Sequence, residues 1–151
     1  MRSLIVEDDL VCRRVLQKLL LAFGPTEAVV NGAEALAAVA QALVDQNPFH
    51  LICLDIDMPD MTGHQVLVQL RKDEDERPDS NAQRVRVLMT SSHSQPEHVV
   101  LSFHNRCDGF LVKPINPQKL AERLHVFGFA PLSEGNYEPA PVVIQPMTGS
   151  F

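Results

Sequence analysis

The sequence predicts an α/β protein built on a doubly wound, five-stranded parallel sheet with helices on both faces. Three observations favour this class. Short apolar runs rich in branched residues alternate with longer segments of helical period. One run, residues 51–54, is apolar at every position, as expected of a central strand covered on both faces. Polar residues follow several of the runs directly, which indicates a functional crevice at the carboxyl ends of the strands.

The elements follow one another in order along the chain. After a strand at 4–6, apolar residues recur every three or four positions until Gly24-Pro25 ends the first helix. Asn31 can cap the second helix, which is alanine-rich and stops before Asn47-Pro48. Pro59 and Gly63 mark the loop before the third helix. The expected strands are 4–6, 27–30, 51–54, 85–89 and 110–112, and the expected helices are 11–23, 33–45, 64–75, 96–105 and 118–127.

The length of 151 residues suits one folded domain followed by a tail. We expect a domain at residues 1–127 and a proline-rich C-terminal tail at 128–151. The apolar residues 142–144 leave three alternatives open, namely a frayed terminus, packing back on the domain, or pairing across a homodimer.

Composition argues against several functions. The formal charge is -6 and basic residues are not clustered, so direct DNA binding is not expected. The apolar run near Met1 is too short for a signal peptide or a membrane span, which predicts a cytoplasmic protein without membrane contact. We expect the three cysteines to be reduced and buried, and each of the six histidines to be exposed or locally hydrogen-bonded rather than to bind metal.

Carboxylates, hydroxyls and one ammonium group are expected at the same edge of the sheet. In strand order they are Glu7, Asp8 and Asp9, then Asp55, then Thr90, Ser91 and Ser92, and finally Lys113. Clustered carboxylates repel, and their hard oxygens favour Mg²⁺ or Mn²⁺ over zinc. Asp55 ends the most buried strand, so it is the natural nucleophile for forming an aspartyl-phosphate. Lys113 and a hydroxyl would stabilise the charge of the transferred phosphoryl group.

These residues resemble the receiver domains of bacterial response regulators over about residues 2–127. The matching segments are Leu4-Ile5-Val6-Glu7-Asp8-Asp9 with Arg13, Leu54-Asp55-Ile56-Asp57-Met58-Pro59 with Gly63, Thr90, and Lys113-Pro114. The resemblance implies a flavodoxin-like, CheY-like fold. It also implies a stand-alone response regulator of a two-component phosphorelay, which accepts a phosphoryl group on Asp55 with Mg²⁺. The donor would be a sensor histidine kinase or a histidine phosphotransfer protein.

The resemblance also implies roles for the metal ligands. Asp8 would bind Mg²⁺ directly, Glu7 would act mainly through a metal-bound water, and Asp57 would contribute its backbone carbonyl. The Asp57 side chain is expected to be solvated, with a contact to the metal shell as the less favoured alternative. Asp9 falls outside the site, and we expect it to cap the first helix.

Further roles concern the phosphoryl group and the response to it. Thr90 would contact the phosphoryl oxygens and move inward, and Lys113 would pair with the phosphate. Phe110 matches the family's aromatic switch position, although a plain core role competes with that interpretation. Ser91 stands where alanine is common in the family, which is expected to alter access to the phosphate. The long polar stretch before the fourth strand is expected to be a surface insertion without catalytic effect.

Output is expected through a protein target, because the residues after 127 are too few for an output domain. Phosphorylation would shift the face formed by the fourth helix, fifth strand and fifth helix. Candidate contacts there are Val99, Val100, Phe103 and Phe110, and the competing interpretation is that these side chains only cover the sheet.

Two other functions compete with this interpretation. The first is a receiver-like module that binds proteins without phosphorylation. The second, much weaker, is a haloacid-dehalogenase-like phosphatase, suggested by Asp55-Ile56-Asp57 but opposed by the acidic pair coming first in the sequence. We expect no enzyme activity beyond the chain's own phosphorylation and dephosphorylation.

Overall fold

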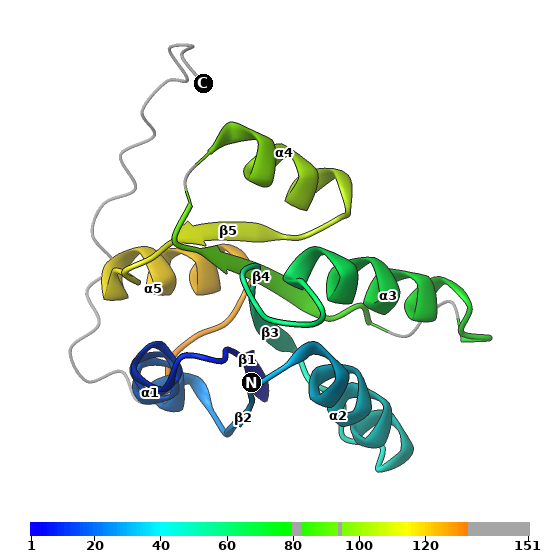
Figure 1. The fold of residues 1–151 in the computed structure, drawn as a ribbon. Helices are drawn as coiled ribbons and strands as arrows, with labels where there is room; N and C mark the ends of the chain where they lie inside the picture. The colour runs from blue at the N-terminus through cyan, green and yellow to red at the C-terminus, as the bar shows by residue number, and fades with distance from the viewer. Residues whose placement is uncertain (80–82, 94, 133–151) are drawn as a thin grey trace.

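A computed structural model describes residues 1–79, 83–93 and 95–132 of the chain. Five parallel strands form one sheet in the order β2-β1-β3-β4-β5 (Figure 1). The strands are β1 (Ser3–Val6), β2 (Thr26–Val29), β3 (Leu51–Asp55), β4 (Arg86–Ser91) and β5 (Gly109–Val112). The strand order changes direction at β1, so the point where β1 meets β3 is the topological switch point of the sheet.

Helices cover both faces of the sheet. They are α1 (Leu10–Leu20), the short 3-10 helix η1 (Leu21–Phe23), α2 (Gly32–Val44), α3 (Gly63–Asp75), α4 (Pro96–His104) and α5 (Pro117–Val126). The helices α1 and α5 lie on one face, α2 and α3 lie on the other, and α4 lies over β5 (Figure 1). The predicted flavodoxin-like, doubly wound architecture is confirmed.

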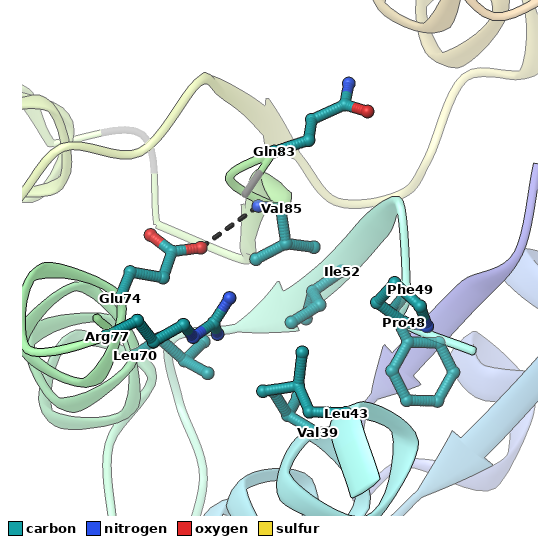
Figure 2. A pocket seen from close by; sticks show the side chains of 10 residues that line it. All are labelled: Val39, Leu43, Pro48, Phe49, Ile52, Leu70, Glu74, Arg77, Gln83 and Val85. Atoms are coloured by element: carbon teal, nitrogen blue, oxygen red, sulfur yellow. Dashed lines mark hydrogen bonds between the residues drawn. The ribbon is translucent and has the colours of Figure 1, made fainter. Parts of the chain in front are cut away.

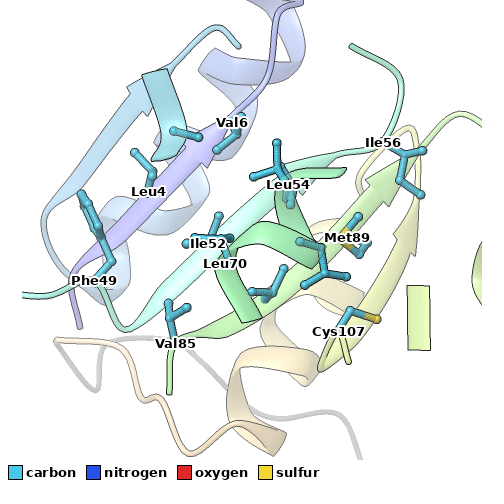
Figure 3. Close-up of a cluster of buried hydrophobic side chains, with 14 of the residues drawn as sticks. Leu4, Val6, Phe49, Ile52, Leu54, Ile56, Leu70, Val85, Met89 and Cys107 are labelled. Carbon is cyan, nitrogen blue, oxygen red and sulfur yellow. The ribbon is translucent and has the colours of Figure 1, made fainter. Parts of the chain in front are cut away.

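Two apolar clusters hold the helices to the sheet because neighbouring strand residues point to opposite faces. Leu4 and Val6 belong to the cluster under α2 and α3, which is drawn in Figure 3, whereas Ile5 belongs to the cluster under α1 and α5. Every residue of β3 is buried, as the continuous apolar run predicts. Full burial of each large aliphatic side chain contributes about 1.5–3 kcal/mol.

Capping side chains fix where the helices begin. Asp9 accepts a hydrogen bond from the backbone N–H of Cys12, and Asn31 accepts one from that of Glu34. Thr62 and Gln65 form a reciprocal capping box at the start of α3. Both caps expected from the sequence, Asp9 and Asn31, are therefore confirmed.

The strand boundaries differ from the expected ones by one or two residues. β1 and β5 each begin one residue earlier than expected, and β3 ends one residue later, at Asp55. β2 begins and ends one residue earlier than expected. β4 begins one residue later and continues through Thr90 and Ser91. The extension has a structural cause, because Thr90 is paired with Asp55 on one side and Ser91 with Val112 on the other. Backbone pairing continues here although the apolar run has ended.

A small cavity lies between α2 and α3 near the amino ends of β3 and β4 (Figure 2). Its volume is about 20 Å³, which is room for about one water molecule. Apolar side chains such as Val39 and Ile52 line it, and the Glu74 carboxylate beside it accepts a hydrogen bond from the backbone N–H of Val85. It is too small to be a ligand site.

The chain continues to contact the domain after α5. Phe129 packs against the cluster under α1 and α5, and the backbone N–H of Leu132 donates to the carbonyl of Ala22 at 2.8 Å. The remainder of the expected tail, including residues 142–144, lies outside the described residues. Within the described ranges, no helix is long and apolar enough to cross a membrane.

Candidate functional site

The carboxyl ends of four strands bring the sequence-predicted polar residues to one edge of the sheet. Ligand oxygens of Glu7, Asp8 and Asp55 lie within 4.8 Å of one another. Lys113 Nζ lies 2.6 Å from Glu7 Oε2 and 3.2 Å from Asp55 Oδ1. Glu7 and Asp55 are buried, whereas Asp8 is exposed. The edge therefore combines two buried carboxylates, one solvent-facing carboxylate and one cation.

Close backbone contacts position the loop after Asp55. The Gly63 N–H donates to the carbonyl of Ile56 at 3.0 Å, and the Ile56 N–H donates to that of Thr90 at 2.9 Å. A Cβ atom at position 63 would lie 2.3 Å from the Asp55 carbonyl oxygen. Glycine therefore suits this position, because any side chain would push the loop away from Asp55.

Burial and charge perturb the ionisation of the two central groups. Burial, followed by the charge of Glu7, raises the pKa of Asp55 to about 7, against the opposing effect of Lys113. Burial by itself lowers the pKa of Lys113, but contacts with Glu7 and Asp55 outweigh it and raise that pKa. Lys113 therefore stays protonated at neutral pH, and Asp55 is close to its titration midpoint.

The two oxygens of the Asp55 carboxylate have different surroundings. Oδ1 accepts a hydrogen bond from the backbone N–H of Asp57 at 3.2 Å and also faces Lys113. No described residue donates to Oδ2. Nearby, the Thr90 hydroxyl is buried and has no hydrogen-bond partner in the described part of the chain. One carboxylate oxygen and one hydroxyl thus remain available for a ligand.

The Asp57 side chain is hydrogen-bonded to the end of β4. Its Oδ2 accepts a hydrogen bond from Ser91 Oγ at 3.1 Å, and Ser91 Oγ itself accepts one from the backbone N–H of His93 at 3.0 Å. The side chain is 44% exposed, so the expected solvation is correct only in part. This contact was missed from the sequence because it spans 34 residues and depends on the pairing of β3 with β4.

Two expectations about isolated residue types need correction. His64 is neither exposed nor hydrogen-bonded, because both of its ring nitrogens are buried without a partner among the described residues. Cys53 and Cys107 are buried free thiols as expected, but Cys12 is half-buried on α1. The histidine expectation fails because the ring of His98, on α4, stacks on the His64 ring, and no local pattern in the sequence indicates such a contact.

The expected output face is apolar and partly exposed. Val100 is 64% exposed and Phe103 is 49% exposed, whereas Val99 is half-buried. Phe110 is half-buried and packs against the core cluster under α2 and α3. Its position is compatible with the core role that competes with a switch role.

Glu7, Asp8 and Asp55, called the acidic set below, suit a hard divalent cation. Three carboxylates offer oxygen ligands within one small volume, and Lys113 supplies a single positive charge against them. Oxygen-only sites of this kind suit Mg²⁺, which also keeps several water ligands.

Comparisons with known proteins agree with this geometry. The family model described as the response regulator receiver domain matches residues 3–125. The two-component response regulator ARR10 of Arabidopsis thaliana is 33% identical over 121 residues, which is 80% of this chain and 20% of that protein. The chemotaxis protein CheY-3 of Vibrio cholerae is 29% identical over 126 residues, covering 82% of this chain and 88% of the relative. The matched region spans only 8–28% of the length of ARR10 and three further curated relatives.

Solved structures give the same result. Vibrio cholerae CheY4 superposes with a TM-score of 0.70 at 28% identity, covering 83% of this chain and 97% of that one. The receiver domain of the Arabidopsis thaliana histidine kinase CKI1, complexed with Mg²⁺ and BeF3-, gives a TM-score of 0.73 at 27% identity, covering 84% and 89%. With the strand order, the acidic cluster and the family match in agreement, the chain belongs to the response regulator receiver domain family.

Proposed function

We propose that this protein is a stand-alone response regulator that accepts a phosphoryl group on Asp55 in a Mg²⁺-dependent reaction. The observation that carries the proposal is the asymmetric environment of the Asp55 carboxylate. Lys113 and the Asp57 N–H hold Oδ1, whereas Oδ2 receives no hydrogen bond from the described residues. One oxygen is thus fixed in place and the other is available for attack.

Glu7, Asp8, Asp55 and the backbone carbonyl of Asp57 would hold the Mg²⁺ ion. The close approach of the three carboxylates supports this assignment, and a related receiver domain was solved with Mg²⁺. When bound, the ion would offset the repulsion among the carboxylates and the phosphoryl oxygens. Glu7 already contacts Lys113 and the backbone N–H of Asp9, which favours an indirect role for it in metal binding.

The side chains of this site account for the transfer step. The ionised Asp55 attacks phosphorus through Oδ2, the new O–P bond forms, and the bond from phosphorus to the donor breaks. The donor atom leaves with the electron pair and takes a proton from solvent. Protonated Lys113 pairs with the phosphoryl oxygens, and the Thr90 hydroxyl donates to one of them. Attack of water on phosphorus would then break the bond to Asp55 Oδ2, release inorganic phosphate and return the Asp55 carboxylate to its starting state.

The proposal includes partners and domain limits. A sensor histidine kinase or histidine phosphotransfer protein would supply the phosphoryl group in the cytoplasm. The target would be a protein rather than DNA, since the formal charge is -6. The face that carries Val100 and Phe103 would bind it, with Phe110 coupling that face to Thr90. The receiver domain would comprise residues 1–127 and the tail residues 128–151.

Intact mass spectrometry after incubation with acetyl phosphate tests the proposal. We expect a gain of one phosphoryl group with Mg²⁺, no gain in a chelator, and no gain in Asp55→Asn. Asp57→Asn is the matched control, because it removes a neighbouring carboxylate but keeps the backbone carbonyl. Full labelling of Asp55→Asn would overturn the choice of nucleophile. No labelling of the wild type under any condition would favour the receiver-like module that acts without phosphorylation.

A further inference from the structure

Three histidines from separate segments gather at the rim of the site. His64 lies in the first turn of α3, His98 lies in the first turn of α4, and His93 precedes α4. The ring centroids of His64 and His98 are 6.1 Å apart, and those of His93 and His98 are also 6.1 Å apart. His98 is therefore the central member of the group.

A carboxylate lies beside one of the three rings, that of His93. Asp57 Oδ2 lies 3.9 Å from His93 Nε2, on the side of Asp57 that faces the end of β4. The cluster thus offers three imidazoles and one carboxylate from four places in the sequence. It differs from the acidic set at the sheet edge, where the candidate ligands are carboxylates.

The state of His64 points to a missing partner. Both of its ring nitrogens are buried and receive or donate no hydrogen bond among the described residues. Burial, followed by the proximity of His98, lowers the pKa of His64, so the ring is neutral and keeps a free lone pair. Although the side chain as a whole is only half-buried, buried ring nitrogens without a partner are costly, and an ion is one of the recognised ways to satisfy such atoms.

We propose that His64, His93, His98 and Asp57 form a binding site for a transition-metal ion of the Zn²⁺ class. Neutral imidazoles with one carboxylate are ligands that suit Zn²⁺, Ni²⁺ or Cu²⁺ rather than Mg²⁺. Imidazoles that share a tetrahedral zinc at a Zn–N distance of about 2.0–2.1 Å have ring centroids about 5 Å apart. The two observed separations, of His98 from His64 and from His93, are each about 1 Å longer than that. The ligand atoms of His64, His93, His98 and Asp57 do not all lie within 4.8 Å of one another, so binding requires the rings to rotate and move toward a common point.

The side chains can make this adjustment. His93 is 54% exposed, and His98 is half-buried in the first turn of α4, so neither ring is fixed by the core. Binding would tie the start of α3 and the start of α4 to the loop after β3. If Asp55 is the phosphoacceptor, as proposed above, the ion would hold Asp57 next to the acceptor and restrain movement of α4. This effect rests on the proposed function, whereas metal binding itself does not.

Calorimetric titration of the full chain with ZnCl₂, in saturating Mg²⁺ and without a phosphodonor, tests the site. We expect one ion per chain and at least tenfold weaker binding in His98→Ala. His104→Ala, at the other end of α4, is the matched control and should bind as the wild type does. Titration with Co²⁺ should give visible absorption bands that His98→Ala loses. Because no phosphodonor is present, the result does not depend on whether Asp55 is phosphorylated.

Three results would overturn the site. They are the absence of stoichiometric binding, unchanged binding in His98→Ala, and loss of binding in Asp55→Asn but not in His98→Ala, which would assign the ion to the acidic set. If His98→Ala does not fold, His93→Ala replaces it, because that ring is half-exposed and its loss cannot disrupt the core. We expect the same tenfold weakening in His93→Ala, and unchanged binding there would also reject the site.

Discussion

Replacing Asp55 with Asn is expected to stabilise the protein at neutral to alkaline pH in the absence of Mg²⁺. The Asp55 side chain is 2% exposed and lies beside the carboxylate of Glu7. These surroundings oppose its ionised form, and Asn keeps the shape of the side chain without its charge. Removing a charge that the folded protein destabilises should raise the free energy of unfolding.

The magnitude follows from the pKa of Asp55. That pKa is about 7 in the folded protein, against an ordinary value of 3.8. The folded state therefore binds more protons than the unfolded chain between those two values, and the free energy of unfolding falls as pH rises through this window. The full penalty, at most about 4 kcal/mol, is present above the folded pKa. The pKa of about 7 already includes the opposing effect of Lys113, so this figure is the upper limit of the gain, and we expect a net gain of about 1–3 kcal/mol.

Urea unfolding of the wild type and Asp55→Asn, followed by circular dichroism at about pH 8 and about pH 5, measures the difference. The gain should be largest at the higher pH and shrink at the lower one, where the wild-type carboxyl is protonated. Added Mg²⁺ should stabilise the wild type more than the variant. An equal gain at both pH values, or a less stable variant at the higher pH, would refute the account of the Asp55 environment.

Three further substitutions test the remaining contacts. Arg71→Met should lower the free energy of unfolding by about 3–5 kcal/mol, because the buried Glu74 keeps only the longer 3.9 Å ion pair with Arg84 after losing the one at 2.7 Å. Its half-exposed comparison, Arg84→Met, should cost less than about 1 kcal/mol, and similar urea midpoints for the two variants would contradict this. Thr90→Val should slow labelling by acetyl phosphate without lowering the urea midpoint, because the lost hydroxyl has no hydrogen-bond partner among the described residues. A labelling rate equal to that of the wild type would show that Thr90 does not take part in the reaction. Gly63→Ala should lower the melting temperature and the labelling rate together, because the new Cβ would lie 2.3 Å from the Asp55 carbonyl oxygen. An unchanged melting temperature would show that the loop after Asp55 can move aside without loss of stability.

The fold and the placement of the polar residues could be predicted because both follow from local patterns. Alternating apolar runs give parallel strands, and parallel strands align their carboxyl ends. Asp55 and Lys113 thus come to one edge for reasons readable in the sequence. The extent of β4 could not be read in the same way, because Thr90 and Ser91 are polar and are kept in the strand by their paired neighbours.

Side-chain contacts between distant segments could not be predicted. The hydrogen bond from Ser91 to Asp57 and the stacking of His64 on His98 depend on how α3 and α4 sit on the sheet. No spacing in the sequence reports that arrangement. The spacing of the histidines in the sequence therefore indicates unrelated residues, although three of them lie close together in the structure.

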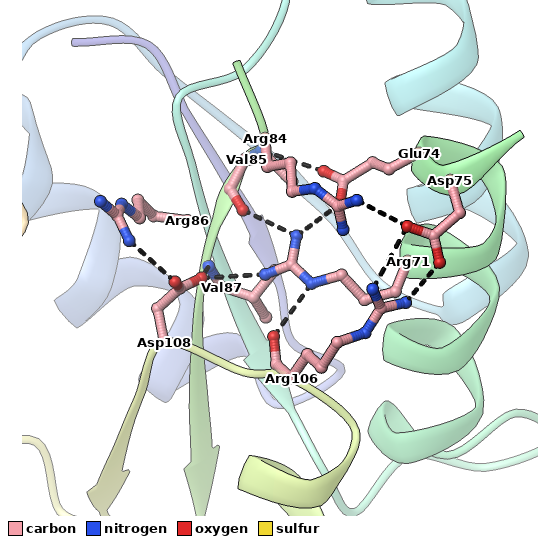
Figure 4. A network of polar contacts seen from close by, with 9 residues as sticks. All are labelled: Arg71, Glu74, Asp75, Arg84, Val85, Arg86, Val87, Arg106 and Asp108. Carbon is pink, nitrogen blue, oxygen red and sulfur yellow. Dashed lines mark hydrogen bonds and ion pairs between the residues drawn. The ribbon is translucent and has the colours of Figure 1, made fainter. Parts of the chain in front are cut away.

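Buried polar groups occur at both ends of the sheet, but they differ in whether they have hydrogen-bond partners. Near the amino ends of β4 and β5, the buried Arg71 donates to Glu74, Asp108 and two backbone carbonyls, so its guanidinium is well partnered (Figure 4). At the carboxyl ends, a buried hydroxyl of Thr90 lacks a described partner and the pKa of Asp55 is raised. Both arrangements bury polar groups, but only the second leaves them unsatisfied, which costs stability unless a ligand completes it. Unsatisfied buried polar atoms thus indicate both the proposed phosphoacceptor edge and His64, which is why we propose a ligand for each.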